Sequence, residues 1–427
     1  MAEIFPFHAT HYNLNLNLNR VIAPPYDQIS PDMQDNLYAR DPHNFVRLIF
    51  GKILANDTPD ANRYSRAADD LLAWMKDGVL TQEPQPAFFV YEQTFSLKDG
   101  ATHTRLGLVG LMALEPLGKG VLPHEHTFAK PKEDRLSLMK ACKANFEHIF
   151  FLYDDPQHFV RKTVADTRCS PPMMTCKDDL GTTHTLWMVS DPRMIRTLQD
   201  FFKNKSLLIA DGHHRYETSL EYQKQMLDIW CSSTSGEAPF NFRMGTFVGL
   251  QDPGLVILPT HRVLRELPPE KLTILKNTLP KYFDIEPAKD LDAMLAALKT
   301  KKHAFGWVRA GKFEVLDLKS SVDLAKEFPE SPEALRTLDV FLLQKLIFEQ
   351  ILKLPHDKLD QFISYVRWPS DASELVQSGS HAMAFLLNPT KPEQVKAVSE
   401  SGEKMPHKST DFYPKLWSGL VFYKMEM

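Results

Sequence analysis

Two hydrophobic periods run along the first part of the chain and predict alternating strands and helices. Short apolar or β-branched runs predict strands at 87–97, 102–114, 150–153, 183–189, 207–210, 247–250 and 256–258. Apolar residues at helical spacing predict helices at 64–76, 134–145, 194–203 and 215–226. The Asp99-Gly100 turn between the first two strands is typical of a β-hairpin. The polar and apolar alternation at 12–19 fits either a strand with one wet face or an Asn-rich loop.

The later part of the chain mixes the same two periods. We predict helices at 271–279, 291–298, 337–354 and 393–400, and strands at 304–309, 312–318, 382–387 and 416–423. A Pro-containing loop at 265–269 marks a boundary between two domains. Hairpins mixed with strand–helix units indicate an α/β (α+β) architecture with mixed sheets. We therefore expect two domains, at 1–265 and 266–427.

Composition narrows the class of protein. Of the 427 residues, 43% are hydrophobic and 24% are charged, which is typical of globular proteins. The net charge of −4 disfavours nucleic acid or an anionic membrane as a partner. No apolar run approaches the roughly 20 residues that span a bilayer, and the first residues lack the pattern of a signal peptide. We therefore expect a cytoplasmic protein with no membrane partner.

The cysteines give no metal or disulfide signature. Cys142, Cys169, Cys176 and Cys231 form no Cys-X-X-Cys pair. In a reducing compartment we expect them to be free thiols.

The densest chemistry lies in a turn between a predicted strand and a predicted helix. It holds Asp211, Gly212, His213, His214 and Arg215. Glycine permits a sharp turn or a close approach to a ligand, and a helix start favours phosphate. The arginine offers a planar fork that suits phosphate oxygens, and core packing does not need its charge there. The aspartate could hold a metal ion or accept a proton.

A purely structural reading of this turn is the alternative. In that reading the aspartate caps the helix and the histidines bond locally. Two adjacent histidines and an arginine directly after a buried strand favour the functional reading, because a structural turn needs no such concentration of titratable groups.

Two further segments carry charged residues in fixed positions. Pro24-Pro25 stiffens the chain and sets the positions of Tyr26 and Asp27. In the segment 130–135, Lys130, Lys132 and Arg135 could reach phosphate, and Glu133 or Asp134 could act as a base or hold Mg²⁺. The alternative for the second segment is a solvated helix start whose acids complement the helix dipole.

Three other clusters leave two interpretations open. His124-Glu125-His126 could bind a metal from one face of a strand, or form a polar loop that closes over the active site. His261-Arg262 follows a strand and could be structural or could bind substrate. Lys408-Ser409-Thr410 has residue types that hold phosphate but lacks the glycine pattern of a Walker loop.

These motifs carry a resemblance to known families. The turn Asp211–Arg215 looks like the signature of the ParB/sulfiredoxin superfamily, in which a related turn at a helix start contacts nucleotide phosphates. The free serine kinases of that superfamily carry an Asp-Gly-His turn of this kind. Sulfiredoxin chemistry is disfavoured, because it needs a cysteine where this chain has His213. The whole chain also resembles a long prokaryotic family of unknown function through the landmarks Pro24–Asp27, Leu122–Glu125, Pro131–Arg135, Ala210–Arg215, Leu258–Arg262, Lys408–Thr410 and Pro414-Lys415.

The resemblance implies a fold, an activity and a set of site residues. It implies a ParB/sulfiredoxin-like N-terminal domain, and a kinase that uses Mg²⁺ with ATP or ADP to phosphorylate a small hydroxy amino acid, free L-serine above all. For this activity Asp27 and Glu133 are our two candidates for the base, and we expect catalytic roles for Asp211 (also the metal ligand) and His213 as well. We expect phosphate to be bound by Gly212, His214, Arg215, Lys130, Lys132, Arg135, Lys408, Ser409 and Thr410. We expect substrate to be bound by Tyr26, His124, His261 and Arg262.

We expect the segments 24–27, 130–135 and 211–215 to converge on one cleft of the N-terminal domain, with 408–410 nearby. Two other functions stay open. One is a non-catalytic regulatory module that binds a nucleotide or an anion. The other is a ParB-like DNA-associated protein, which the acidic charge balance disfavours. The oligomeric state stays open as well.

Overall fold

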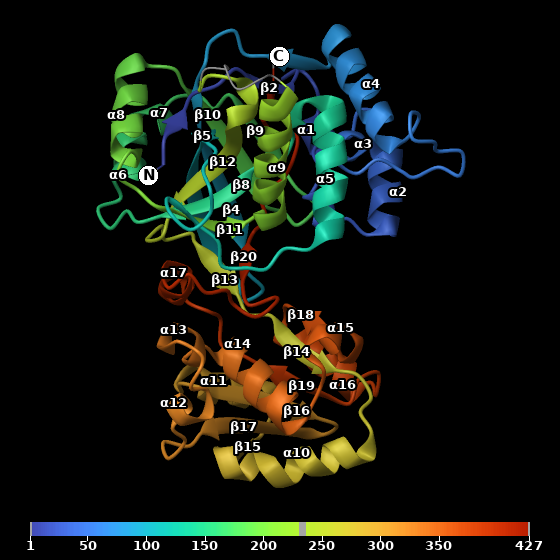
Figure 1. Ribbon diagram of the computed structural model, residues 1–427, viewed down its shortest axis with the longest axis vertical. Coiled ribbons are helices and arrows are strands. Elements are labelled where there is room, and N and C mark those ends of the chain that lie inside the picture. Colours follow the sequence, from blue (N-terminus) through green and yellow to red (C-terminus); the bar gives the residue numbers. More distant parts are fainter. Residues whose placement is uncertain (1, 230–235, 426–427) are drawn as a thin grey trace. The chain divides into compact units, whose positions relative to one another are not determined.

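The computed structural model describes residues 2–229 and 236–425, which form two compact units (Figure 1). Unit 1 comprises Met1–Pro123, Thr127–Leu255 and Pro414–Met427, and unit 2 comprises His124–His126 and Val256–Tyr413. Unit 2 is therefore inserted into the sequence of unit 1. The expected free thiol Cys231 lies outside the described residues, whereas Cys142, Cys169 and Cys176 are free.

A large mixed sheet forms the centre of unit 1. Its strands follow the order β6-β11-β8-β12-β5-β4-β10-β9, with β1 paired to β5. The pairs β6–β11 and β8–β12 are parallel, and the other neighbouring strands are antiparallel. The strands are β1 (Ile4–Phe5), β4 (Phe88–Ser96), β5 (Thr102–Ala113), β6 (Val121–Leu122), β8 (Ile149–Tyr153), β9 (Met174–Lys177), β10 (Thr183–Val189), β11 (Leu207–Asp211) and β12 (Phe242–Gly249).

Helices and a small sheet surround this large sheet. The small antiparallel sheet has the order β3 (Leu80–Gln82), β2 (Ala9–Tyr12), β21 (Phe422–Lys424) and β7 (Ala144–Asn145). Two of the helices, α5 and α9, run side by side (Figure 1). The helices are α1 (Leu18–Val21), η1 (Tyr26–Gln28), α2 (Pro31–Arg40), α3 (Val46–Ile49), α4 (Arg63–Lys76), α5 (Ala129–Cys142), α6 (Phe159–Thr163), α7 (Ala165–Arg168), α8 (Pro192–Phe202), α9 (His213–Ile229) and η2 (Pro239–Asn241).

Strand β8 shows how the two faces of the large sheet differ. Successive side chains of a strand point to opposite faces. Phe151 and Tyr153 join a buried cluster with Phe202 of α8. Phe150 lies on the other face, where the Cζ atom of the buried Arg105 is 4.6 Å from its ring centroid. One face therefore packs as an apolar core, and the other receives polar side chains.

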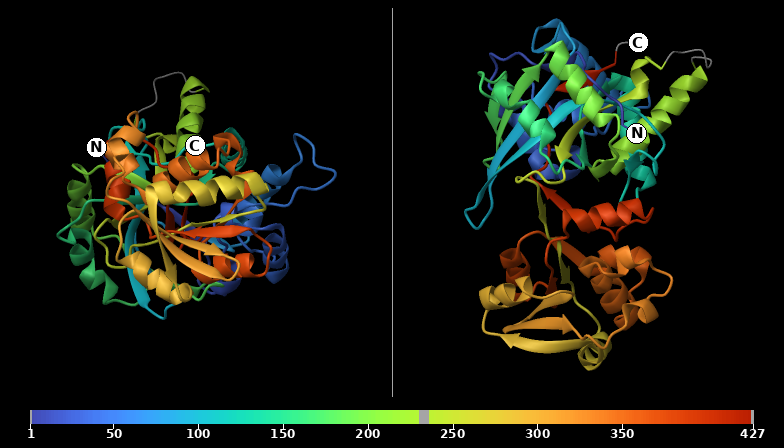
Figure 2. Two further views of the ribbon diagram at one scale, coloured as in Figure 1. Left: turned by 90° about the horizontal axis from the view of Figure 1, so that it is seen from below. Right: turned by 90° about the vertical axis from the view of Figure 1, so that its left-hand side faces the viewer.

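Unit 2 is built on an antiparallel sheet, drawn in yellow to red in Figure 2. On β19, Ala384 and Leu386 pack in a cluster with residues of α11 and α16, whereas Phe385 contacts Phe348 of η3. Helices therefore cover both faces. The strand order is β15 (Phe283–Ala288), β17 (Lys312–Leu318), β16 (Ala304–Arg309), β19 (Met383–Leu386), β14 (His261–Leu264) and β18 (Ile363–Val366), and β13 (Val256–Leu258) pairs separately with β20 (Asp411–Tyr413).

The helices of unit 2 are mostly short. They are α10 (Pro269–Tyr282), α11 (Leu291–Lys299), α12 (Leu324–Glu327), α13 (Glu333–Arg336), α14 (Asp339–Leu342), the π-helix η3 (Leu343–Ile351), η4 (His356–Lys358), α15 (Leu359–Phe362), α16 (Pro369–Gln377) and α17 (Pro392–Glu400). In the described ranges, no helix combines the length and the apolarity that a membrane crossing requires.

The mixed α/β class with several sheets is confirmed, as are both hairpins and most of the predicted elements. Three predictions need correction. Helix α5 begins at Ala129 rather than 134, so the segment 130–135 lies inside it. The segment 337–354 is a short α-helix followed by a π-helix. The closing strand covers only Phe422–Lys424. Of the two interpretations of 12–19, the loop holds for most of the segment, because Tyr12 ends β2, a turn follows, and α1 begins at Leu18.

We predict that Phe151→Ala strongly destabilises unit 1. Phe151 is fully buried, and its ring stacks on Phe247 with centroids 5.4 Å apart. Removing a buried aromatic ring should lower the free energy of unfolding by about 3–5 kcal/mol, as measured by urea denaturation. Leu72→Ala on α4, where the leucine is 61% exposed, is the control and should change it by less than about 0.5 kcal/mol. Equal effects of the two substitutions would contradict this packing.

Candidate functional site

A single glycine connects β11 to α9. Gly212 has a φ of +100°, which side chains other than glycine rarely adopt. A Cβ atom there would lie 3.0 Å from Ile149 Cδ1 and 3.2 Å from Arg215 Nε. The turn therefore requires glycine for its conformation and for close packing against Arg215.

Arg215 is buried inside unit 1. Its side chain donates through Nη1 to the backbone carbonyl of His148 at 2.5 Å and through Nη2 to Asp211 Oδ2, and the residue is only 6% exposed. The expectation that packing does not need this charge is wrong. Arg215→Ala would remove the buried donor that the carbonyl of His148 faces and would disturb the fold.

Glu147 is the centre of a buried ionic network. The residue is 5% exposed, and its Oε1 accepts from the backbone N–H of Tyr26 at 3.1 Å. Its Oε2 lies 3.4 Å from Arg135 Nη1, and its backbone carbonyl accepts from Arg243 at 2.6 Å. Our sequence reasoning missed Glu147, although an acidic residue directly before a buried strand is a signal that could have found it.

Arg135 connects the segments 24–27 and 130–135. It donates to Asp134 through Nε at 2.8 Å and to the backbone carbonyl of Ile49 at 2.8 Å. Its Cζ lies 3.9 Å from the ring centroid of Tyr26. The network thus fixes the backbone and the ring of Tyr26, the residue next to Asp27.

Asp27 differs from the other acids of the network. Within the described residues its side chain has no hydrogen bond and no ion pair, and the residue is exposed at the surface. Burial among surrounding protein atoms raises the pKa of its carboxyl group. The charge of Asp211 raises this pKa further, and Arg215 and Lys415 oppose the rise.

Asp211 is held by two cations. Arg215 donates to its Oδ2 atom, and the Nζ atom of Lys415 lies 3.3 Å from its Oδ1 atom. The structure thereby brings together Tyr26, Asp27, Arg135 and the turn 211–215, all within unit 1.

The other predicted residues of unit 1 lie around the adjoining helices α5 and α9. His213 is buried, and the Nε2 atom of His214 accepts from the backbone N–H of Phe128 at 2.9 Å. Lys132 pairs with Glu217 at 2.8 Å beside a cavity of about 520 Å³. Lys130 and Glu133 are both exposed, and Glu133 lines that cavity. Of the two candidate bases, only Asp27 therefore adjoins the charges of Asp211 and Arg215.

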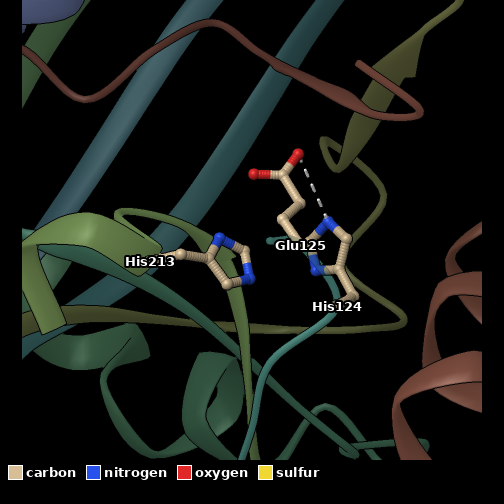
Figure 3. Close-up of side chains that lie close together, drawn as sticks. All are labelled: His124, Glu125 and His213. Carbon is tan, nitrogen blue, oxygen red and sulfur yellow. Dashed lines mark ion pairs between the residues drawn. The ribbon is translucent and has the colours of Figure 1, made fainter. Parts of the chain in front are cut away.

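The predicted residues of unit 2 form a cluster of their own. His124 Nε2 is 3.0 Å from Thr410 Oγ1 and 3.9 Å from Glu125 Oε1, and Figure 3 draws the latter pair. Figure 3 also labels His213, the first residue of α9 in unit 1. His124 and Glu125 offer a nitrogen and an oxygen ligand, and the metal hypothesis for this cluster stays a prediction.

The loop around Lys408 is held by bonds within unit 2. Arg262 donates to the backbone carbonyls of His407 and Lys408 at 3.2 and 3.1 Å. Ser409 is buried and donates to the carbonyl of Pro406. His261 is buried, and burial lowers its pKa to about 3. Roles of these residues in binding phosphate or substrate stay predictions.

Comparison with known proteins identifies the family of the chain. The model of a family described as proteins of unknown function (DUF1015) matches residues 4–341. The chain belongs to the DUF1015 family. No curated protein matches this DUF1015 chain.

Three solved structures are similar to the DUF1015 chain at low identity. A free serine kinase variant in complex with ADP is 12% identical with a TM-score of 0.35, over 72% of this chain and 89% of its own. A conserved hypothetical protein from Pyrococcus furiosus is 13% identical with a TM-score of 0.35, over 73% and 98%. SbnI with a C-terminal truncation from Staphylococcus aureus is 11% identical with a TM-score of 0.37, over 73% and 86%.

We predict that Asp27→Asn stabilises the DUF1015 chain at neutral pH. Because the folded state raises the pKa of Asp27, it binds this proton more tightly than the unfolded state does. Ionisation of Asp27 therefore lowers stability as pH rises from the ordinary value of 3.8 through the raised one. The variant lacks this loss, so its melting temperature should exceed that of wild type at pH 7 and should match it at pH 3.

Asp60→Asn in an exposed loop is the control and should melt like wild type at both values of pH. A variant Asp27→Asn that melts below wild type at pH 7 would show that the ionised carboxylate stabilises the fold.

Proposed function

We propose that this protein is a nucleotide-dependent phosphotransferase whose acceptor is the hydroxyl group of a small hydroxy amino acid, free L-serine being the best single candidate. The observation that carries the proposal is the unpaired carboxyl group of Asp27, whose pKa is raised, beside the cation-paired Asp211. The sequence resemblance of the turn Asp211–Arg215 to the free serine kinases supplies the nucleotide and the acceptor.

Asp27 is the proposed general base. A base with a raised pKa accepts a hydroxyl proton more readily than an ordinary carboxylate does. The hydroxyl oxygen then forms a bond to the terminal phosphorus of the nucleotide, the bond from that phosphorus to its bridging oxygen breaks, and the shortened nucleotide leaves. The hydroxyl proton stays on Asp27 until solvent removes it.

The remaining residues position the reactants and balance charge, which phosphoryl transfer needs most. The start of α9 after Gly212 is a helix N-terminus, whose backbone N–H groups and dipole favour phosphate. Glu147 and Arg135 fix Tyr26, and with it the backbone that carries Asp27. Asp211 supplies the carboxylate oxygen that Mg²⁺ prefers. Mg²⁺ bound there would neutralise phosphate charge.

One observation favours the binding module as the second candidate. The guanidinium groups of Arg135 and Arg215 donate to acceptors of the protein itself. If these arginines serve only to hold the fold, then the site would retain a nucleotide or an anion without transferring phosphate.

The test is phosphate-ester formation by the purified chain. We expect wild type, given Mg²⁺ and either ATP or ADP, to convert L-serine to O-phospho-L-serine, followed by ³¹P NMR against a panel with L-threonine, L-homoserine and glycerol. Asp27→Asn should lower the rate by about 10²–10⁴-fold, the usual contribution of a general base.

Glu133→Gln is the matched carboxylate control. Glu133 is exposed on α5, so its amide variant should retain the wild-type rate. Loss of activity in Glu133→Gln with full activity in Asp27→Asn would reverse the assignment of the base. A wild-type chain that binds nucleotide but forms no phosphate ester with any acceptor would leave the binding module as the function.

A further inference from the structure

The C-terminal segment brings a further cation into the site of unit 1. After the chain has passed through unit 2, Pro414 and Lys415 return to unit 1. The carbonyl of Lys415 accepts from Gln93 Nε2 at 3.0 Å, and the carbonyl of Pro414 accepts from Arg105 Nη2 at 2.5 Å. Gln93 and Arg105 are themselves buried. The backbone of Lys415 therefore has a fixed position on the large sheet.

The ammonium group of Lys415 acts on both carboxylates of the site. Its Nζ atom lies 3.3 Å from Asp211 Oδ1, and the side chain is 17% exposed. Its charge also lowers the pKa of Asp27. Lys415 thus adds positive charge that acts on both Asp211 and Asp27.

The two cations that hold Asp211 differ in freedom of movement. Arg215 is planar, and it also donates to the carbonyl of His148, so a shift of its guanidinium breaks two contacts. Lys415 carries a compact charge at the end of a flexible four-carbon stem. Because its backbone is anchored separately, a movement of its ammonium group away from Asp211 leaves the backbone bonds to Gln93 and Arg105 in place.

We propose that Lys415 guards the metal-binding oxygen of Asp211 and then becomes a phosphate ligand. Without a divalent cation, its ammonium group holds Asp211 Oδ1. If a divalent cation bound that oxygen, the ammonium group would be repelled from it, because two cations in contact repel each other. The displaced ammonium group then pairs with a phosphate oxygen of the nucleotide, a charge-assisted contact. This inference rests on the proposed function, in which Asp211 holds Mg²⁺ beside the nucleotide.

The test uses Mn²⁺ alone as the probe, followed by isothermal titration calorimetry at pH 8. Lys415→Met should bind Mn²⁺ about tenfold more tightly than wild type, a difference of about 1.4 kcal/mol, because no ammonium group competes. With saturating Mn²⁺, the same variant should bind ADP about tenfold more weakly. Lys415→Arg keeps the charge and should restore the wild-type affinity for Mn²⁺.

Lys424→Met is the matched control, a lysine of the same returning segment in β21. It should leave both affinities unchanged. A merely structural role of Lys415 would lower the melting temperature of Lys415→Met without tightening Mn²⁺ binding, and that result would overturn the proposal. Absence of Mn²⁺ binding in every variant would overturn it as well.

Neither binding measurement needs an acceptor or turnover. A wild-type chain that binds Mn²⁺ and ADP but phosphorylates nothing would therefore end the proposed function, while the two affinities of Lys415→Met would still decide the role of this lysine.

Discussion

The buried carboxylate of Glu147 is the constraint on which the site of unit 1 depends. An ionised carboxylate out of water is costly unless opposite charge and hydrogen bonds compensate it. The backbone N–H of Tyr26 and the guanidinium of Arg135 provide that compensation, and Arg243 bonds to the carbonyl of the same residue. Segments far apart in the sequence are thereby held at one place.

This network separates paired charges from one that has no partner. Asp134 and Asp211 each face an arginine, so they serve the fold as much as any ligand. Asp27 follows the fixed Tyr26, and its carboxyl group has no hydrogen bond and no ion pair among the described residues. Burial and the charge of Asp211 disfavour the ionised form of Asp27, so its ionisation costs stability. Such a cost is typical of a functional residue.

The sequence predicted what depends on local patterns. The spacing of hydrophobic residues located β8, β11 and α9. The residue types at 211–215 located the turn, whose backbone conformation requires Gly212. The charged partners of this turn could not be predicted, because Glu147 and Lys415 are far from it in the sequence and only the fold brings them near it. Burial of Arg215 was missed for the same reason: the carbonyl of His148 that holds it belongs to another strand segment. We placed the start of α5 too late, because its first turn carries charged residues and so lacks the apolar spacing that indicates a helix.

The charge of Asp211 and the burial of Asp27 together raise the pKa of Asp27. The most direct test is ¹³C NMR of aspartate labelled at the side-chain carboxyl, with the Asp27 signal identified by its loss in Asp27→Asn and followed through a pH titration. The account predicts that Asp27 titrates above the ordinary value of 3.8 and that Asp211→Asn lowers its pKa, because one repelling charge is gone. Titration of Asp27 at 3.8 in both proteins would contradict the account.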